Sequence, residues 1–525
     1  MATRPGATRP IPARRWARRG LPPPARRVSS GWWSPSCGGR RPCEFPTRSL
    51  RALVGAPSIP TKPLRGFAGA PGFGSGPRGV TAWRGKAAPG QREATVARGA
   101  SRAAFRGAAR LRLAGGRASR RACRKPREGN RAMNQLAAPV AASQPLSRAE
   151  HAAGMAAYQA AGEALAAEIN NRGPLRLTAD GQLHPDIQAA YWKHGYYIFE
   201  GVIDAAEVAA LREDAQEMLA RAPVGPEAKL DAQGRPALGI DYARLPYRFS
   251  KPLGDPWGGT TLLNGRHPAQ MSQPVPDAGA PEHVVFLMYA MCQAMPSGLR
   301  LYGHPGLLAA AQSINGPDFV PFNDAIFVKQ PGLGGSVAWH QDGVTHWNNP
   351  AWDEGIHGFN YQVQLYPTTP ANGLWVIPGT HKRGKADIKG MVAANGGSEQ
   401  LPGAVPLVCK AGDVTMVNRQ TVHGSFANSS PDMRISLTFG FHRRRSVLGQ
   451  RAALSIAETN AIYDAQRIFD RSAVIQVAID ARRQARPGEP VFHYQPFAGL
   501  EEEFRCTPEV FDRVIRDYNT KDLAI

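Results

Sequence analysis

The sequence predicts a mainly β protein with flanking helices, and two observations support this prediction. Between Phe322 and Phe441, short runs rich in Val, Ile, Phe and Tyr alternate with turns rich in Gly, Pro and Asn. Several short strands at this spacing are typical of an antiparallel sandwich or barrel. Helical patterns, by contrast, lie before residue 315 and after residue 450. The predicted strands are in the runs DAIFVK, SVAWHQD, FNYQVQLY, GLWVIP, VPLVC, DVTMVN and RISLTFGF.

The formal net charge of +23 on the 525-residue chain comes from one segment. Residues 1–132 contain 30 of the 64 Lys and Arg residues but only three of the 41 acidic residues. This Arg-, Gly-, Pro- and Ala-rich segment has no periodicity and buries too little apolar surface to offset the entropy of ordering, so we expect it to be disordered. The remaining residues carry a slight net negative charge. The positive net charge of the whole chain therefore gives no information about what these residues bind.

Residues 1–132 have three interpretations: a nucleic-acid-binding tail, an organelle transit peptide, or a segment that is not part of the native protein. The third places the native start at Met133, where the composition changes abruptly. It is favoured because arbitrary GC-rich DNA encodes the same mixture of residues. The segment also has no RGG repeat, and we do not expect nucleic acid as a partner.

The rest of the chain divides into an N-terminal helical arm over residues 133–180, a β domain over residues 181–450 and a C-terminal helical extension over residues 451–525. Ser147 and Glu150 form an S-x-x-E capping box that predicts the start of the first helix. Within the β domain we expect a helix over Ile187–His194, a strand over Gly195–Phe199, a helix capped by Asp204, a loop over residues 222–282, and apolar helices over Val284–Met295 and Pro305–Ile314.

The cysteines and the hydropathy predict a soluble intracellular protein. The six cysteines are scattered and form no C-x-x-C pair, which excludes a disulfide scaffold. Single thiols suit a reducing cytoplasm, where we expect the protein to be located. The longest apolar stretch, Val284 to Met295, is shorter than the ~18 residues that a membrane span needs, so no membrane partner is expected.

A candidate metal site is predicted at Trp339-His340-Gln341-Asp342. On a strand, residues two apart project from the same face, so His340 and Asp342 are expected to point into one cavity. His423, after the run DVTMVN, offers a second imidazole. Two histidines and one carboxylate are the facial ligand set of non-haem Fe(II) oxygenases, which leaves positions for a chelating 2-oxoacid and for O2.

Arg434, eleven residues after His423, strengthens this prediction. Alternation places Arg434 and Ser436 on one face of a strand, opposite the apolar residues. An arginine that faces the interior of a barrel needs an anion, and a guanidinium can hold a carboxylate through two parallel hydrogen bonds. The alternative is an internal salt bridge.

These four positions together resemble the phytanoyl-CoA dioxygenase family of Fe(II)/2-oxoglutarate oxygenases. Agreement extends to the segments KQPGLGGSVAWHQD, NGLWVIPGTHK and HGYYIFEGVIDAAEVAALRED, and covers about residues 185–445. The resemblance implies a double-stranded β-helix, the jelly roll of cupin-like proteins. It also implies iron binding by His340, Asp342 and His423, and binding of 2-oxoglutarate by Arg434 and Ser436.

Further roles follow from the resemblance. Lys329 and Gln362 are candidates for contact with 2-oxoglutarate, although Lys329 could instead be an exposed strand residue and the glutamines the solvated face of an edge strand. The carboxylate of Asp342 favours oxidation over halogenation, since related halogenases have a small residue there. Candidate substrate-pocket residues are Gln341, His346, Trp347, Trp352 and Gln364; the two tryptophans could equally pack their own loop.

The sequence thus predicts an Fe(II)- and 2-oxoglutarate-dependent dioxygenase that uses O2 to oxidise a small organic substrate and releases succinate and CO2. The alternative is a cupin-like metalloenzyme, a hydrolase or isomerase that uses no 2-oxoacid. Arg434 distinguishes the two, because only the oxygenase needs a carboxylate-binding residue there. The sequence does not predict the substrate or the oligomeric state.

Overall fold

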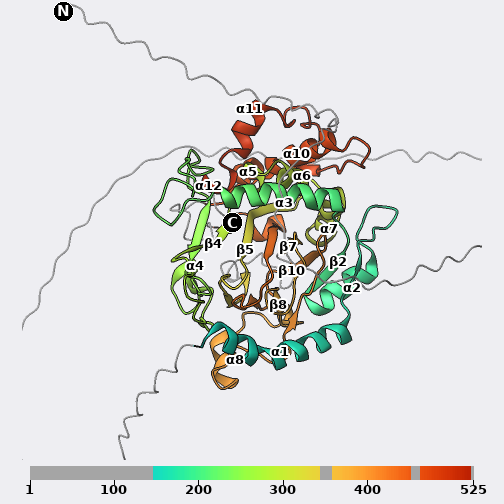
Figure 1. Cartoon of the computed structure of the whole chain (residues 1–525). Coiled ribbons are helices and arrows are strands. Elements are labelled where there is room, and N and C mark those ends of the chain that lie inside the picture. The colour runs from blue at the N-terminus through green and yellow to red at the C-terminus, as the bar shows by residue number, and fades with distance from the viewer. Residues whose placement is uncertain (1–145, 343–357, 451–461, 522–525) are drawn as a thin grey trace, which may run out of the picture. The chain divides into compact units, whose positions relative to one another are not determined.

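The runs of alternating residues form two β-sheets (Figure 1). The computed structural model describes residues 146–342, 358–450 and 462–521; the segment 1–132, predicted to be disordered, lies outside them. The eight-stranded sheet has, in spatial order, β1 (Arg172–Pro174), β2 (Tyr196–Glu200), β10 (Val414–Asn418), β7 (Gly358–Gln364), β12 (Arg434–His442), β5 (Val320–Lys329), β4 (Val284–Met288) and β3 (Tyr247–Ser250). The four-stranded sheet has β6 (Val337–His340), β11 (His423–Ser425), β8 (Trp375–Val376) and β9 (Val405–Pro406).

The strand order identifies the fold. Along the chain, β5 to β12 cross repeatedly between the large and the small sheet, and their neighbours are β10-β7-β12-β5 in one and β6-β11-β8-β9 in the other. All pairs within these two sets are antiparallel. This arrangement is a double-stranded β-helix, or jelly roll, as the resemblance implied. The predicted fold class is therefore confirmed.

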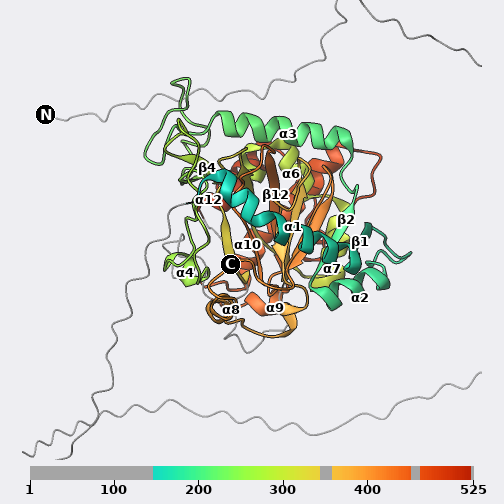
Figure 2. The same cartoon turned by 60° about the horizontal axis from the view of Figure 1, so that its bottom comes forward.

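Helices cover the outside of both sheets (Figures 1 and 2). Their bounds are α1 Arg148–Ile169, α2 Pro185–His194, α3 Ala205–Ala220, α4 Leu262–Gly265, α5 Met291–Ala294, α6 Pro296–Tyr302, α7 Pro305–Asn315, α8 Ile388–Ala394, α9 Arg444–Val447, α10 Ala465–Ala485, α11 Pro508–Val510 and α12 Tyr518–Lys521. Among the described residues, no helix combines the length and the apolar character needed to cross a membrane.

Helix α1 begins and ends as predicted and packs on the small sheet. The Ser147 hydroxyl accepts from Glu150 N at 3.2 Å, and Glu150 accepts from Ser147 N at 2.8 Å, which completes the capping box. Asn170, with φ of 46°, ends the helix in the left-handed conformation. A Cβ atom at Gly162 would lie 2.5 Å from the Trp375 ring, so only glycine allows this close approach of helix and strand.

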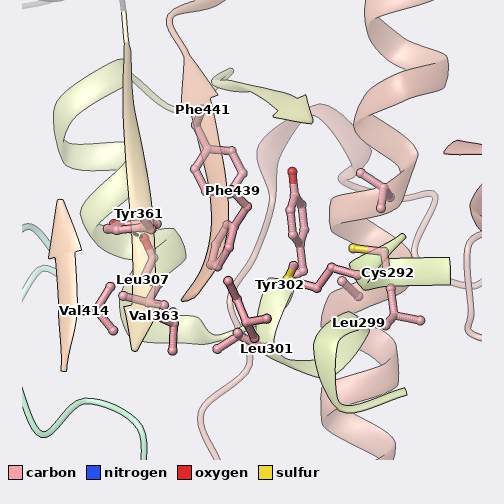
Figure 3. Packing of buried hydrophobic residues seen from close by; sticks show 14 of the residues in the cluster. Cys292, Leu299, Leu301, Tyr302, Leu307, Tyr361, Val363, Val414, Phe439 and Phe441 are labelled. Atoms are coloured by element: carbon pink, nitrogen blue, oxygen red, sulfur yellow. Dashed lines mark hydrogen bonds between the residues drawn. The ribbon is translucent and has the colours of Figure 1, made fainter. Parts of the chain in front are cut away.

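The outer face of the large sheet holds the main hydrophobic core. Leu437, Phe439 and Phe441 of β12 project from this face toward the helical layer. Figure 3 shows the two phenylalanines pointing toward Tyr302 of α6, whose ring centroid is 5.1 Å from that of Phe439. The long C-terminal helix α10 packs on α6 and β5 and belongs to this layer.

Two predictions for the middle of the chain are wrong. Val284–Met295, predicted as one apolar helix, is strand β4 followed by the short helix α5. Both faces of β4 are buried, and a continuous apolar run does not distinguish a doubly buried strand from a helix. Residues 222–282, predicted as a loop, contain strand β3, an edge strand of the large sheet, and helix α4.

Candidate metal centre

The two predicted histidines are on adjacent strands of the small sheet. His423 in β11 is the register partner of His340, the last residue of β6, and their ring centroids are 4.1 Å apart. Asp342 follows two residues after His340. Its two carboxylate oxygens are 3.5 Å from His340 Nε2 and 3.6 Å from His423 Nε2. All three side chains are buried and converge on one point between the sheets.

Hydrogen bonds fix both imidazoles in the orientation that a metal needs. His340 Nδ1 lies 2.8 Å from Ala338 O, and His423 Nδ1 lies 2.8 Å from Thr421 O. A carbonyl can only accept, so each Nδ1 carries the proton and each Nε2 presents its lone pair. Burial, with the neighbouring His340, lowers the pKa of His423 to about 3, which keeps this ring neutral at physiological pH.

Asp342 is held as a carboxylate by its surroundings. Burial alone would raise its pKa, but the positive charges of Arg266 and Arg419 outweigh burial and hold the pKa well below the usual range. Asn360 Nδ2 donates to its Oδ2 at 2.6 Å. Two imidazoles and one carboxylate fit a divalent cation, and no other cluster of His, Cys, Asp and Glu among the described residues does so.

Arg434 lines the same cavity, at the start of β12. It donates to Asn372 O at 3.1 Å, Gln362 Oε1 at 2.9 Å and Ser436 Oγ at 3.2 Å. Its buried Nε has no partner, and no carboxylate of the described residues pairs with it, which argues against the internal salt bridge. Burial lowers its pKa to about 10, so the guanidinium remains charged at neutral pH. The cavity therefore offers a cation-binding set and, beside it, a cationic side chain that has no carboxylate partner among the described residues.

Comparison with known proteins agrees with this geometry. Residues 272–436 match the model of a family described as phytanoyl-CoA dioxygenase (PhyH). A protein of Oryza sativa subsp. japonica, phytanoyl-CoA dioxygenase 1, is 34% identical over 117 residues, which is 21% of this chain and 40% of the relative. Within these matched residues, the chain is similar to the phytanoyl-CoA dioxygenase family.

Other matches are more limited. The phytanoyl-CoA dioxygenase of Arabidopsis thaliana is 31% identical over 115 residues, or 20% of this chain and 38% of that protein. The matches thus span well under half the length of either relative. Among solved structures, EctD from S. alaskensis, crystallised with 2-oxoglutarate and 5-hydroxyectoine, is 22% identical with a TM-score of 0.34, and covers 51% of this chain and 79% of that chain. The assignment of the jelly-roll fold rests on the strand order and not on this TM-score.

The remaining residues assigned to 2-oxoglutarate lie near Arg434. Ser436 and Gln362 both accept hydrogen bonds from it, and Gln362 lines the cavity. Lys329 is not exposed: it is the register partner of Arg434 on β5, is buried, and donates from Nζ to Phe426 O. The interpretation as an exposed strand lysine is therefore wrong, and the ammonium group does not line the cavity.

None of the predicted substrate-pocket residues is found lining the cavity among the described residues. Gln341 does not line the metal cavity, because its side chain bonds on the other side of the strand end to Gly384 O, Gln420 O and Ala386 N. Gln364, the register partner of Ser436, is buried without lining the cavity, so neither glutamine of β7 is on a solvated face. Three residues, His346, Trp347 and Trp352, lie outside the described residues.

Sequence reasoning missed the wall contributed by residues 250–290. Arg266 lines the cavity and forms an ion pair with Asp342 at 2.9 Å. His267 is fully buried, and its ring centroid is 4.2 Å from that of His340. Trp257 lines the cavity and contacts His267. The residues around Arg266 have no regular periodicity, and the available signal was an Arg-His pair nine residues after Trp257.

Proposed function

We propose that the protein is an Fe(II)- and 2-oxoglutarate-dependent dioxygenase that hydroxylates or otherwise oxidises a small organic substrate, with release of succinate and CO2. One observation carries the proposal: a His-Asp-His donor set and a buried, charged arginine without a carboxylate partner among the described residues line the same cavity. Each feature alone also suits enzymes of other classes, but their combination is what this reaction requires.

In this proposal the donor set binds the iron through His340 Nε2, His423 Nε2 and the Asp342 carboxylate. Bound iron would supply the oxidation chemistry, which no amino-acid side chain has. The backbone carbonyls on the two Nδ1 atoms orient the rings, and Asn360 orients the carboxylate. The burial of all three ligands excludes bulk water from the reacting positions.

Arg434 would bind the distal carboxylate of 2-oxoglutarate. The unpartnered Nε supports this role, because a buried donor without an acceptor is costly and a carboxylate would satisfy it. Gln362 and Ser436 would then hold the guanidinium in position through Nη2. The alternative enzyme, a cupin-like hydrolase or isomerase, has no use for this arginine. Unchanged affinity for 2-oxoglutarate in Arg434→Gln would favour that alternative.

The direct test is succinate release. Purified protein incubated with Fe(II), 2-oxoglutarate, O2 and a metabolite extract should release succinate and give products heavier by one oxygen. Asp342→Ala should abolish both, and circular dichroism should show that the variant is folded. His283→Gln, which changes a histidine away from the cavity, is the matched control. Succinate release that is the same in Asp342→Ala and the parent protein would refute the proposal.

The proposal also includes a small-molecule substrate and a cellular location. The cavity is lined largely by apolar and aromatic side chains, including Leu287, Tyr289 and Phe327, which suits a substrate with an apolar body. A cytoplasmic location, expected from the scattered single cysteines, is tested by cell fractionation.

A further inference from the structure

Two arginines of the described residues line the cavity, and they are held in different ways. Arg434 donates to three neutral acceptors, and no carboxylate among the described residues neutralises its charge. The Arg266 side chain is only 10% exposed, and its partner is the Asp342 carboxylate, whose Oδ1 lies 2.9 Å from Nη1. Its Nε is buried without a partner. Among the described residues, Asp342 is therefore the anion that balances Arg266.

Asp342 is also the carboxylate of the candidate metal centre, so the two roles compete. The oxygen that Arg266 contacts, Oδ1, is the same oxygen that lies 3.5 Å from His340 Nε2. A divalent cation bound between these atoms would take up the charge of Asp342 and would repel the nearby guanidinium. Arg419, whose Nη2 is 3.4 Å from Asp342 O, already adds a second positive charge on that side.

A loaded metal centre would thus leave Arg266 as a buried cation without an anion. Such a charge is costly unless a new partner arrives. Asp342 is the only carboxylate among the described residues that line the cavity. In the proposed reaction, the negative charges of 2-oxoglutarate balance the positive charges of the metal and of Arg434. No negative charge of this cosubstrate is left to balance Arg266. Among the described residues and the cosubstrate, no other anion is left for Arg266, and this favours the second substrate as its source.

We infer that Arg266 binds a carboxylate of the oxidised substrate, so that this substrate is an organic anion with an apolar body. The inference rests on the proposed function and adds the substrate class to it. The apolar part is assigned to the same wall: Trp257 and Leu263 come from the segment that carries Arg266, and Tyr289 and Phe322 from β4 and β5 or their ends. Before the metal binds, Arg266 holds Asp342; afterwards it holds the substrate.

The first experiment measures metal binding alone. Titration calorimetry with Mn(II) or Zn(II) should give a dissociation constant that is about tenfold lower in Arg266→Gln than in the parent protein, because the guanidinium no longer competes for Asp342. Arg505→Gln, a change of an arginine that is 46% exposed in the C-terminal extension, is the matched control and should bind like the parent. Weaker metal binding in Arg266→Gln would overturn the exchange of partners.

The second experiment measures binding of the anion. With Ni(II) and saturating 2-oxoglutarate, 3-phenylpropionate and decanoate are compared with their primary amides by tryptophan fluorescence and by the shift in Tm. The parent protein should bind at least one acid about tenfold more tightly than its amide. Arg266→Gln should abolish this preference and Arg266→Lys should restore part of it. Octyl phosphate serves as a third probe; tighter binding of the phosphate than of both carboxylates would contradict the carboxylate assignment.

The failure of this inference differs from the failure of the proposed function. If the preference for acids persists in Arg266→Gln while Arg434→Gln loses 2-oxoglutarate, the inference is wrong and the oxygenase assignment stands. If the parent protein does not bind 2-oxoglutarate, the oxygenase assignment fails, and the metal titration still reports on Arg266 because it uses no 2-oxoacid.

Discussion

The two faces of β12 contribute differently to the free energy of folding. On the outer face, Leu437, Phe439 and Phe441 are fully buried against helices and aromatic rings. On the inner face, Arg434 and Thr438 line the cavity and keep unpartnered polar atoms. The same nine residues thus contribute to a fully packed hydrophobic core on one side. On the other side they contribute to a polar site in which some atoms have no hydrogen-bond partner.

This difference has a physical consequence. The outer face contributes apolar burial, which stabilises the folded state whatever ligand is present. The inner face retains buried groups whose partners are incomplete, which costs stability until a ligand supplies them. Changes on the outer face should therefore alter the free energy of unfolding, and changes on the inner face should alter ligand affinity.

The largest expected effect is on metal affinity. His423→Gln removes one of three ligands, and loss of a ligand should cost more than the roughly 10- to 100-fold typical of losing an outer partner. The free energy of unfolding of the metal-free protein should change by less than about 1 kcal/mol, because a neutral side chain is replaced by another. Titration calorimetry and urea unfolding measure the two quantities. A large loss of stability would show that the two faces are not separable.

Phe439→Ala should show the reverse pattern. Removing a buried phenylalanine from the outer face should lower the free energy of unfolding by about 3–5 kcal/mol, while the metal affinity of the folded fraction stays unchanged. The matched control is Thr438→Ala, the adjacent residue on the inner face, whose buried hydroxyl has no partner and whose loss should cost little. Equal destabilisation by the two substitutions would contradict the comparison.

Arg434→Gln tests the inner face on the same strand. Loss of a charged donor to a carboxylate should weaken 2-oxoglutarate binding by a factor of roughly 30 to 1,000, and Arg434→Lys should recover only part of it because lysine cannot form two parallel hydrogen bonds. Metal affinity without 2-oxoglutarate should remain at the parent value. Calorimetry in the presence of Ni(II) distinguishes these outcomes.

The smallest effect concerns pH and the helical layer. His304 caps α7, and its Nδ1 accepts from Leu307 N at 3.3 Å. Burial, with nearby Arg482, lowers its pKa to about 3. The folded state therefore favours the neutral ring, so its contribution to stability is complete above pH 6.5 and is lost as the pH falls toward 3. In His304→Asn, which keeps a capping acceptor, the loss of stability between pH 7 and pH 5 should be smaller by at most about 2 kcal/mol. Urea unfolding at both pH values measures this, and identical pH dependence would exclude His304 as the cause.

Local pattern in the sequence was sufficient for most strands between Phe322 and Phe441 and for the core of the site. Alternation assigned Arg434 and Ser436 to one face of β12 and Phe439 to the other, and the H-x-D spacing correctly predicted that His340 and Asp342 share a cavity. Alternation also required Gln341 to point away from His340, so its assignment to the pocket was inconsistent with the pattern itself.

The short strand β11, the doubly buried β4 and the wall around Arg266 could not be derived in this way. His423 lies in a strand of three residues, too short to show a period, and an apolar run such as Val284 to Met288 has no polar face to reveal its type. Arg266 comes within 2.9 Å of Asp342 through a segment that is far from it in sequence and has no repeating pattern.

The sequence by itself determined which residues lie on the same face of a strand, because every second side chain of a strand points in the same direction. What only the tertiary structure decided is which charges meet across the cavity. Pairing of Arg266 with Asp342, and the lack of a carboxylate for Arg434 among the described residues, depend on how separate elements pack. Local sequence carries no information about such long-range electrostatic balance.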